Sequence, residues 1–141
     1  MIFFVLGSHP DLSIAEIFSV IGKKPIVLQT QEVLILDDVY ESLERLQERL
    51  AGSIKIGTVL QMFEAMDEDA IVDLVTSIAS QAEGKNKISF GMSGYGCSQR
   101  EMFQLGKRVK QQLKHTQRPV RFVTSKEAQL SSVIVHENVL L

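Results

Sequence analysis

Within the first 60 residues, short apolar runs alternate with segments of helical periodicity, and this order narrows the choice of folds. The run at residues 1–6 ends at Gly7 and predicts a buried strand, and apolar residues recur at helical spacing over 14–21. The full expectation is a strand at 1–6, a helix over 14–21, strands at 26–29 and 33–36, a helix over 39–50 and a strand at 54–60. This β-α-β-β-α-β order is typical of the split-βαβ, or ferredoxin-like, arrangement.

The pattern also predicts which side chains of this unit face its core. Leu43, Leu46 and Leu50 form one apolar face of the second helix, whereas glutamates and arginines occupy the opposite side. In the last strand, the alternation of side chains places Ile54 and Ile56 on the same face of the sheet.

The second half of the chain has a different order of elements. We expect a helix from the acidic triplet 67–69 toward Gly84, a strand at 87–92, a helix from Gln99 to about His115, and strands at 120–123 and 132–135. In the helix that begins at the acidic triplet, the apolar stripe is expected at Ile71, Leu74, Val75 and Ile78. Ser98 and Glu101 have the spacing of a capping box. The fold class is therefore α+β, with one domain at 1–62 and a second α/β domain at 63–141.

Composition limits the classes of protein to which this chain can belong. A hydrophobic fraction of 45% with seven phenylalanines argues against disorder, and no stretch approaches the roughly 18 apolar residues of a membrane span. The single cysteine, Cys97, excludes an internal disulfide and a multi-cysteine zinc site. We expect a cytoplasmic protein with no metal and no membrane partner. The oligomeric state is not predicted.

Charge is distributed unevenly along the chain. Residues 1–98 hold 7 Lys and Arg against 14 Asp and Glu, a balance of −7. Residues 99–126 hold eight basic residues against Glu101 alone, a balance of +7. The basic residues are Arg100, Lys107, Arg108, Lys110, Lys114, Arg118, Arg121 and Lys126. This asymmetry predicts contacts to a phosphate backbone through the helix after Ser98 and the strand that follows it.

No set of residues in the sequence resembles an active site. The chain has no GxxxxGKS loop and no GxGxxG turn, and its histidines share no metal-ligand spacing. The glycine-rich stretch 91–96 is best explained as an exit from a strand into the capped helix. A phosphate bound at the start of that helix, near Gln99, is a further hypothesis. Phe122 is expected to be a core residue rather than a platform for a base.

Four segments resemble THUMP-containing tRNA guanine-N2 methyltransferases. Residues 4–16 (FVLGSHPDLSIAE) are similar to the start of that family. Residues 120–127 (VRFVTSKE) and 130–135 (LSSVIV) resemble the end of its THUMP region. Residues 52–57 (GSIKIG) resemble the link between its two modules. The resemblance implies a ferredoxin-like domain followed by a THUMP domain.

The resemblance implies a role in docking RNA. In that family, THUMP modules bind the 3′ acceptor end of tRNA and present the tRNA to a downstream methyltransferase domain that uses S-adenosylmethionine. The chain ends at Leu141 without a catalytic motif, so we expect no catalysis and no cofactor in this chain, either as the N-terminal part of a longer enzyme or as a separate subunit. Arg121, Thr124, Ser125 and Lys126 match the family's motif and are expected to contact RNA. Charge alone adds Lys107, Lys110, Lys114 and Arg118 to the expected site.

Two alternatives to RNA docking remain open at the level of sequence. Ferredoxin-like units assemble through their sheet edges, so the chain is alternatively a protein-interaction module. The second alternative is a regulatory module that holds a small molecule in the loop 91–96. A stand-alone enzyme is the least favoured, because no nucleophile, base and orienting group are found together.

Overall fold

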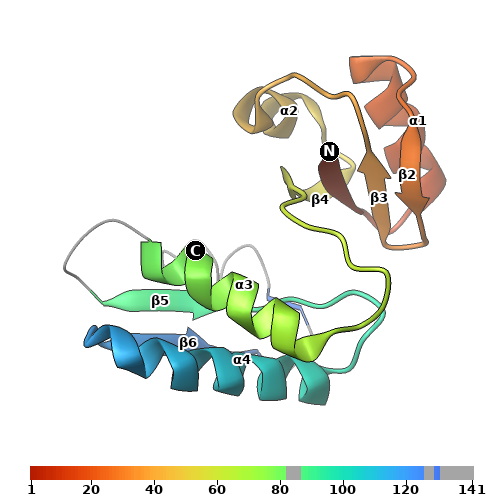
Figure 1. The fold of residues 1–141 in the computed structure, drawn as a ribbon. Coiled ribbons are helices and arrows are strands. Elements are labelled where there is room, and N and C mark those ends of the chain that lie inside the picture. Colours follow the sequence, from red (N-terminus) through yellow and green to blue (C-terminus); the bar gives the residue numbers. More distant parts are fainter. Residues whose placement is uncertain (82–86, 126–128, 131–141) are drawn as a thin grey trace. The chain divides into compact units, whose positions relative to one another are not determined.

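The structure is a computed structural model, and it describes residues 1–81, 87–125 and 129–130. The chain divides into two compact units, Met1–Met62 and the chain from Phe63 onward (Figure 1). Both units combine helices with strands, which confirms the α+β class. The expected strand 132–135 and the expected helix end at Gly84 lie outside the described residues.

The first unit contains one antiparallel sheet and two helices. Its elements are β1 (Ile2–Leu6), α1 (Pro10–Ile21), β2 (Ile26–Gln29), β3 (Val33–Leu36), α2 (Leu43–Arg49) and β4 (Ser53–Thr58). The strands lie in the order β2-β3-β1-β4, and each is antiparallel to its neighbour. The two strands joined by the short turn, β2 and β3, have the bounds that the sequence predicts. Each helix therefore connects strands that are not adjacent in the sheet.

The core of this unit lies between one face of the sheet and the two helices. Alternate residues of β1 and β3 point into it, so that Phe4 and Leu34 are fully buried. Ile17 of α1 and Leu46 of α2 cover them and are fully buried too. The expected apolar face of α2 is confirmed. The helix begins later than expected, at Leu43 rather than residue 39, because the Ser42 hydroxyl accepts the N–H of Arg45 and caps it.

The prediction that Ile54 and Ile56 share one face of β4 is wrong. The register between β1 and β4 shifts near the end of β1, where Leu6 lies opposite Ser53 and Phe4 lies opposite Ile56. An additional residue in β4 therefore interrupts the alternation of side chains. As a result, Ile56 packs against the core while Ile54 is 54% exposed.

Two glycine loops of the first unit are joined through α1. A Cβ on Gly7 would lie 2.9 Å from the carbonyl oxygen of Gly52, so the two backbones approach too closely for a larger residue. The Ser13 hydroxyl donates to the Gly52 carbonyl at 2.7 Å and accepts the Gly7 N–H at 3.3 Å. The Glu16 carboxylate accepts the N–H groups of Ala51 and Gly52 at 3.0 and 2.8 Å. These bonds fix α1 to the loop that leads into β4.

The second unit pairs two helices with a small parallel sheet. Its described elements are α3 (Glu68–Gln81), β5 (Ile88–Gly91), α4 (Gln99–Leu113), the 3-10 helix η1 (Lys114–Thr116) and β6 (Val120–Val123). The strands β5 and β6 are parallel, since α4 carries the chain back between them. In Figure 1, α3 and α4 lie alongside each other next to these strands.

The core of the second unit confirms one helix pattern and corrects another. Its buried side chains are Val72, Ala79, Ile88, Phe90, Met102, Leu105, Val109 and Leu113. The last four of these are the stripe expected for α4, which is confirmed. The expected stripe of α3 is confirmed only in part: Val75 packs against the core, but Ile78 is exposed, and the fully buried residues are Val72 and Ala79. Both Ile78 and Ala79 are apolar, so the sequence of α3 alone does not fix which of them meets α4.

Candidate nucleic-acid interface

The helix α4 begins at the capping box that the sequence predicts. The Ser98 hydroxyl accepts the Glu101 N–H at 3.3 Å, and the Glu101 carboxylate accepts the Ser98 N–H at 2.7 Å. Hydrogen bonds from the backbone and then the side chain of Ser98 lower the pKa of Glu101 below its usual value. A carboxylate therefore occupies the start of this helix, where it repels an anion. This geometry argues against the phosphate that the sequence suggests near Gln99.

One flank of α4 is tied to α3 by charges. Arg108 donates to the Glu68 carboxylate at 2.9 Å and to the Asp69 carboxylate, and its hydrogen bond to Asp69 raises its pKa. One turn further along, the Gln112 side-chain amide donates to the Asp73 carboxylate at 3.1 Å. Arg108 belongs to the basic stretch of the sequence, but acidic residues of the preceding helix neutralise it in space. The charge asymmetry along the chain is therefore partly cancelled by folding.

The opposite flank of α4 carries one aromatic residue and two lysines, and a third lysine follows directly at the start of η1. Phe103, Lys107, Lys110 and Lys114 are separated by four, three and four residues, a spacing that places them along one side of a helix. Lys107 and Lys114 are exposed and Lys110 is half-buried. Among the described residues, no acidic side chain forms an ion pair with these lysines. We call these four residues the aromatic–lysine flank.

Three aromatic rings connect this flank to the sheet. The Phe122 ring of β6 lies 5.1 Å from the buried Phe90 ring and 6.2 Å from the Phe103 ring, measured between centroids, and both pairs are stacked. Gly106 lies beneath Phe122, where any Cβ would collide with the ring. The Lys107 ammonium lies 5.1 Å from the centroid of the Phe103 ring. Phe122 is thus packed against the core, as expected, while Phe103 remains 37% exposed.

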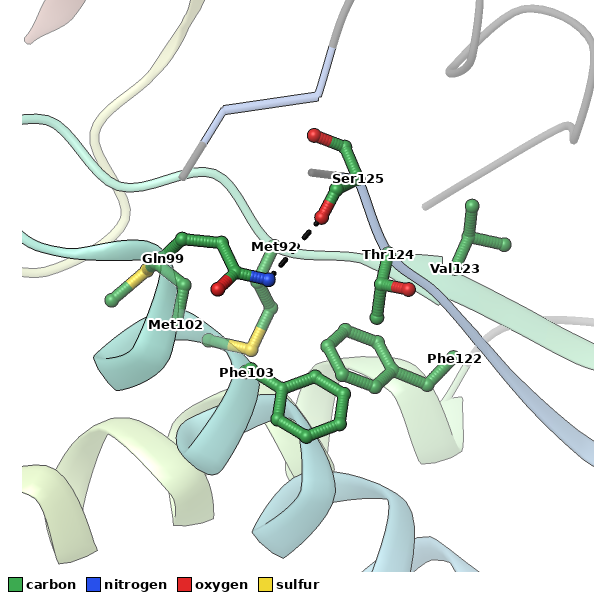
Figure 2. A pocket seen from close by; sticks show the side chains of 8 residues that line it. All are labelled: Met92, Gln99, Met102, Phe103, Phe122, Val123, Thr124 and Ser125. Carbon is green, nitrogen blue, oxygen red and sulfur yellow. Dashed lines mark hydrogen bonds between the residues drawn. The ribbon is translucent and has the colours of Figure 1, made fainter. Parts of the chain in front are cut away.

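A small pocket opens where the strands β5 and β6 end and α4 begins. Its lining residues are Met92, Gln99, Met102, Phe103, Phe122, Val123, Thr124 and Ser125 (Figure 2). The Gln99 side-chain amide donates to the Ser125 carbonyl at 3.3 Å and joins the helix to the chain after β6. The Ser125 hydroxyl donates to the Gln129 carbonyl at 3.0 Å. The pocket therefore combines aromatic and thioether walls with amide and hydroxyl groups at one rim.

The residues expected to bind RNA do not form a single surface. Thr124 and Ser125 line the pocket next to Phe103, whose other neighbour is Lys107. Arg121 is exposed on β6, but it precedes Phe122 in the strand and therefore points to the opposite face of the sheet. The other expected residues are Lys110 and Lys114 on the flank, Arg118 half-buried in the turn before β6, and Lys126, which lies outside the described residues.

Phe103 and the contact made by the Gln99 side chain were not predicted from the sequence. Phe103 is apolar but lies off the buried stripe of α4, and Lys107 follows it by four residues. An aromatic residue outside the apolar stripe, followed by lysines at helical spacing, is a signal that the sequence contains. The role of Gln99 has no such signal, because its partner Ser125 comes 26 residues later.

Comparisons with known proteins leave the family of this chain open. No protein-family model, no curated protein and no solved structure matches it. Among the described residues, no group of three or more His, Cys, Asp or Glu side chains is placed to hold a metal ion. No helix in the described part of the chain has the length and apolar character needed to cross a membrane.

Proposed function

We propose that the second unit docks RNA along the aromatic–lysine flank of α4. The observation that carries this proposal is the coincidence, on one side of one helix, of an exposed phenylalanine and three lysines that have no acidic partner in the described part of the chain. Single-stranded nucleic acids are bound by this combination, because a base stacks on the aromatic ring while ammonium groups neutralise the backbone. A surface that recognised folded protein would carry fewer lysines, which are depleted at such interfaces.

Each part of the site has a separate task in this proposal. Phe103, held by Phe122 beneath it, offers the exposed part of its ring to one base, beside the Lys107 ammonium that lies over it. Lys107 and Lys114, about 10 Å apart along the helix axis at 1.5 Å per residue, contact two phosphates of the same strand. Thr124 at the pocket rim supplies a hydroxyl for a base edge or a 2′-hydroxyl.

The RNA that we propose is the single-stranded 3′ acceptor end of tRNA. The element order of the first unit and its strand order, β2-β3-β1-β4, support a ferredoxin-like domain. The resemblance of residues 4–16 and 120–127 then supports a THUMP-type domain after it. In this proposal the chain is the substrate-docking region of an S-adenosylmethionine-dependent tRNA guanine-N2 methyltransferase, and a downstream domain performs the methyl transfer. The residues described here position the RNA and carry no catalytic step.

The test is fluorescence anisotropy with a folded tRNA transcript, with and without its 3′ CCA end, at two salt concentrations. We expect binding that weakens with salt at a log–log slope of about −0.7 for each phosphate neutralised, and that weakens when the CCA end is removed. The variant Lys107→Ala with Lys114→Ala should bind less tightly with a smaller salt slope.

A matched variant controls for the loss of charge. Lys23→Ala with Arg45→Ala removes two exposed cations from the first unit and should leave RNA binding nearly unchanged. Equal losses of affinity in both variants would show that attraction by net charge, rather than the flank, accounts for binding. Equal affinity for tRNA with and without its CCA end would overturn the assignment to the acceptor end.

A further inference from the structure

The strand β2 of the first unit exposes all four of its residues. Ile26, Val27 and Leu28 retain 51%, 41% and 43% of their surface. Because β2 lies at one end of the strand order, it pairs on one side only, with β3, among the described residues. An apolar strand with one open backbone edge is a template to which another strand can add.

The opposite end of the same sheet is better protected against such pairing. The strand β4 carries the charged residue Lys55, and both edge strands contain a register shift. A charged side chain on an edge strand opposes strand addition. None of the four residues of β2 is charged. Pro25, just before β2, and the register shift between Ile26 and Leu28 limit pairing to a few backbone bonds, so the association is weak.

The charges on either side of β2 indicate what kind of strand would add to it. Lys23 precedes the strand, and Glu32 lies in the turn that follows it. If two copies of β2 pair antiparallel, the basic end of each strand lies beside the acidic end of the other. A two-fold axis repeats this favourable arrangement at both ends of the pair.

We propose that β2 pairs with the β2 strand of a second copy of this chain. The pairing joins two four-stranded antiparallel sheets into one continuous sheet, with the apolar side chains of the two β2 strands beside each other. This dimer contact involves the first unit alone and is independent of RNA docking by the second unit.

Sedimentation velocity of the whole chain tests the dimer, over concentrations from about 1 to about 500 μM, where weak complexes dissociate. We expect a monomer–dimer equilibrium. Leu28→Lys should raise the dissociation constant about tenfold or more, because the two-fold axis places the added charge on both strands. Ile54→Lys, at a similarly exposed position on β4, is the control and should leave the equilibrium unchanged. Circular dichroism melting checks that both variants fold.

Charge exchange provides a second test of the same contact. Lys23→Glu and Glu32→Lys should each weaken the dimer, and the two changes combined should restore it. A chain that remains monomeric at all concentrations overturns the proposal. A dimer that Leu28→Lys and Ile54→Lys weaken equally also overturns it, as does a double charge exchange that fails to restore dimerisation. Capture of a foreign strand by a monomeric chain would assign β2 to another partner and likewise overturn the proposal.

Discussion

Replacement of Gly106 by alanine tests whether the packing of α4 against β6 builds the proposed site. Gly106 is buried in the middle of α4, and a Cβ there would come within 2.5 Å of Cε2 of Phe122 and closer to other ring atoms. The ring lies between Phe90, at 5.1 Å, and Phe103, at 6.2 Å, so it has little room to move aside. The substitution therefore forces the aromatic stack and the helix apart.

Two opposing effects determine the size of the change. Alanine is the better helix former, which stabilises the folded state by about 1 kcal/mol. Overpacking in a close-packed core costs about 1–3 kcal/mol. Because the Cβ meets ring atoms that are held on two sides, we expect the upper part of that range and a net loss of about 1–2 kcal/mol. A domain of this size then melts several degrees lower, since each kcal/mol corresponds to roughly 4–8 °C.

A double-mutant cycle with Phe122→Leu separates the collision from other causes. Leucine has no atoms at the position of the outer ring, so Gly106→Ala in that background should be neutral or stabilising by up to about 1 kcal/mol. Urea unfolding, followed by circular dichroism, measures the four free energies of unfolding. An equal cost of Gly106→Ala in the original chain and in the Phe122→Leu background would refute the reasoning, because the ring would then not be the obstacle.

Three further results are expected. The pKa of Glu101 is lower in the folded state than its unfolded value of 4.5. The ionised carboxylate therefore stabilises the fold above pH 4.5, and this contribution is lost as the pH falls through the folded-state pKa. Glu101→Gln should flatten the acid side of the curve of stability against pH, and an unchanged curve would contradict this. Ser13→Ala removes a buried hydroxyl with bonds to two loops and should cost about 1–2 kcal/mol by urea unfolding, whereas Ser19→Ala, an exposed control, should cost less. In RNA titrations, Arg108→Ala should lose less affinity than Lys107→Ala because Arg108 is already paired with acids, and the reverse order would place RNA on the other flank of α4.

Local patterns located the described helices and strands to within a few residues of their ends; α1, for example, begins at Pro10 rather than at residue 14. The turn between β2 and β3, the capping box of α4 and its buried stripe are confirmed because each depends on residues within a few positions of one another. The late start of α2 was missed because the local cap at Ser42 outweighs the apolar residue Val39 before it. Both signals are present in the sequence: the apolar spacing predicts a start at Val39, whereas the capping side chain of Ser42 predicts a later one.

Side-chain orientation was less predictable than element position. The bulge in β4 turns Ile54 away from the core, and the six residues of that strand contain no signal that predicts the bulge. The bulge becomes evident only when β4 is aligned with β1, to which it is paired across about 50 residues of chain. The orientation of α3 was predicted only in part for a similar reason, because apolar residues occupy much of its surface and contact with α4 selects the buried ones.

The candidate site shows the same division between local and distant causes. The sequence by itself determined that α4 is basic, where it begins and which side is buried, since helical geometry repeats every 3.6 residues. Only the tertiary structure decided that Arg108 is neutralised by Glu68 and Asp69, and that Lys107 lies over a ring supported by β6. Charges and rings distant in sequence interact once folding brings them within a few ångströms. The net charge of a segment therefore does not determine which of its cations are available to a ligand.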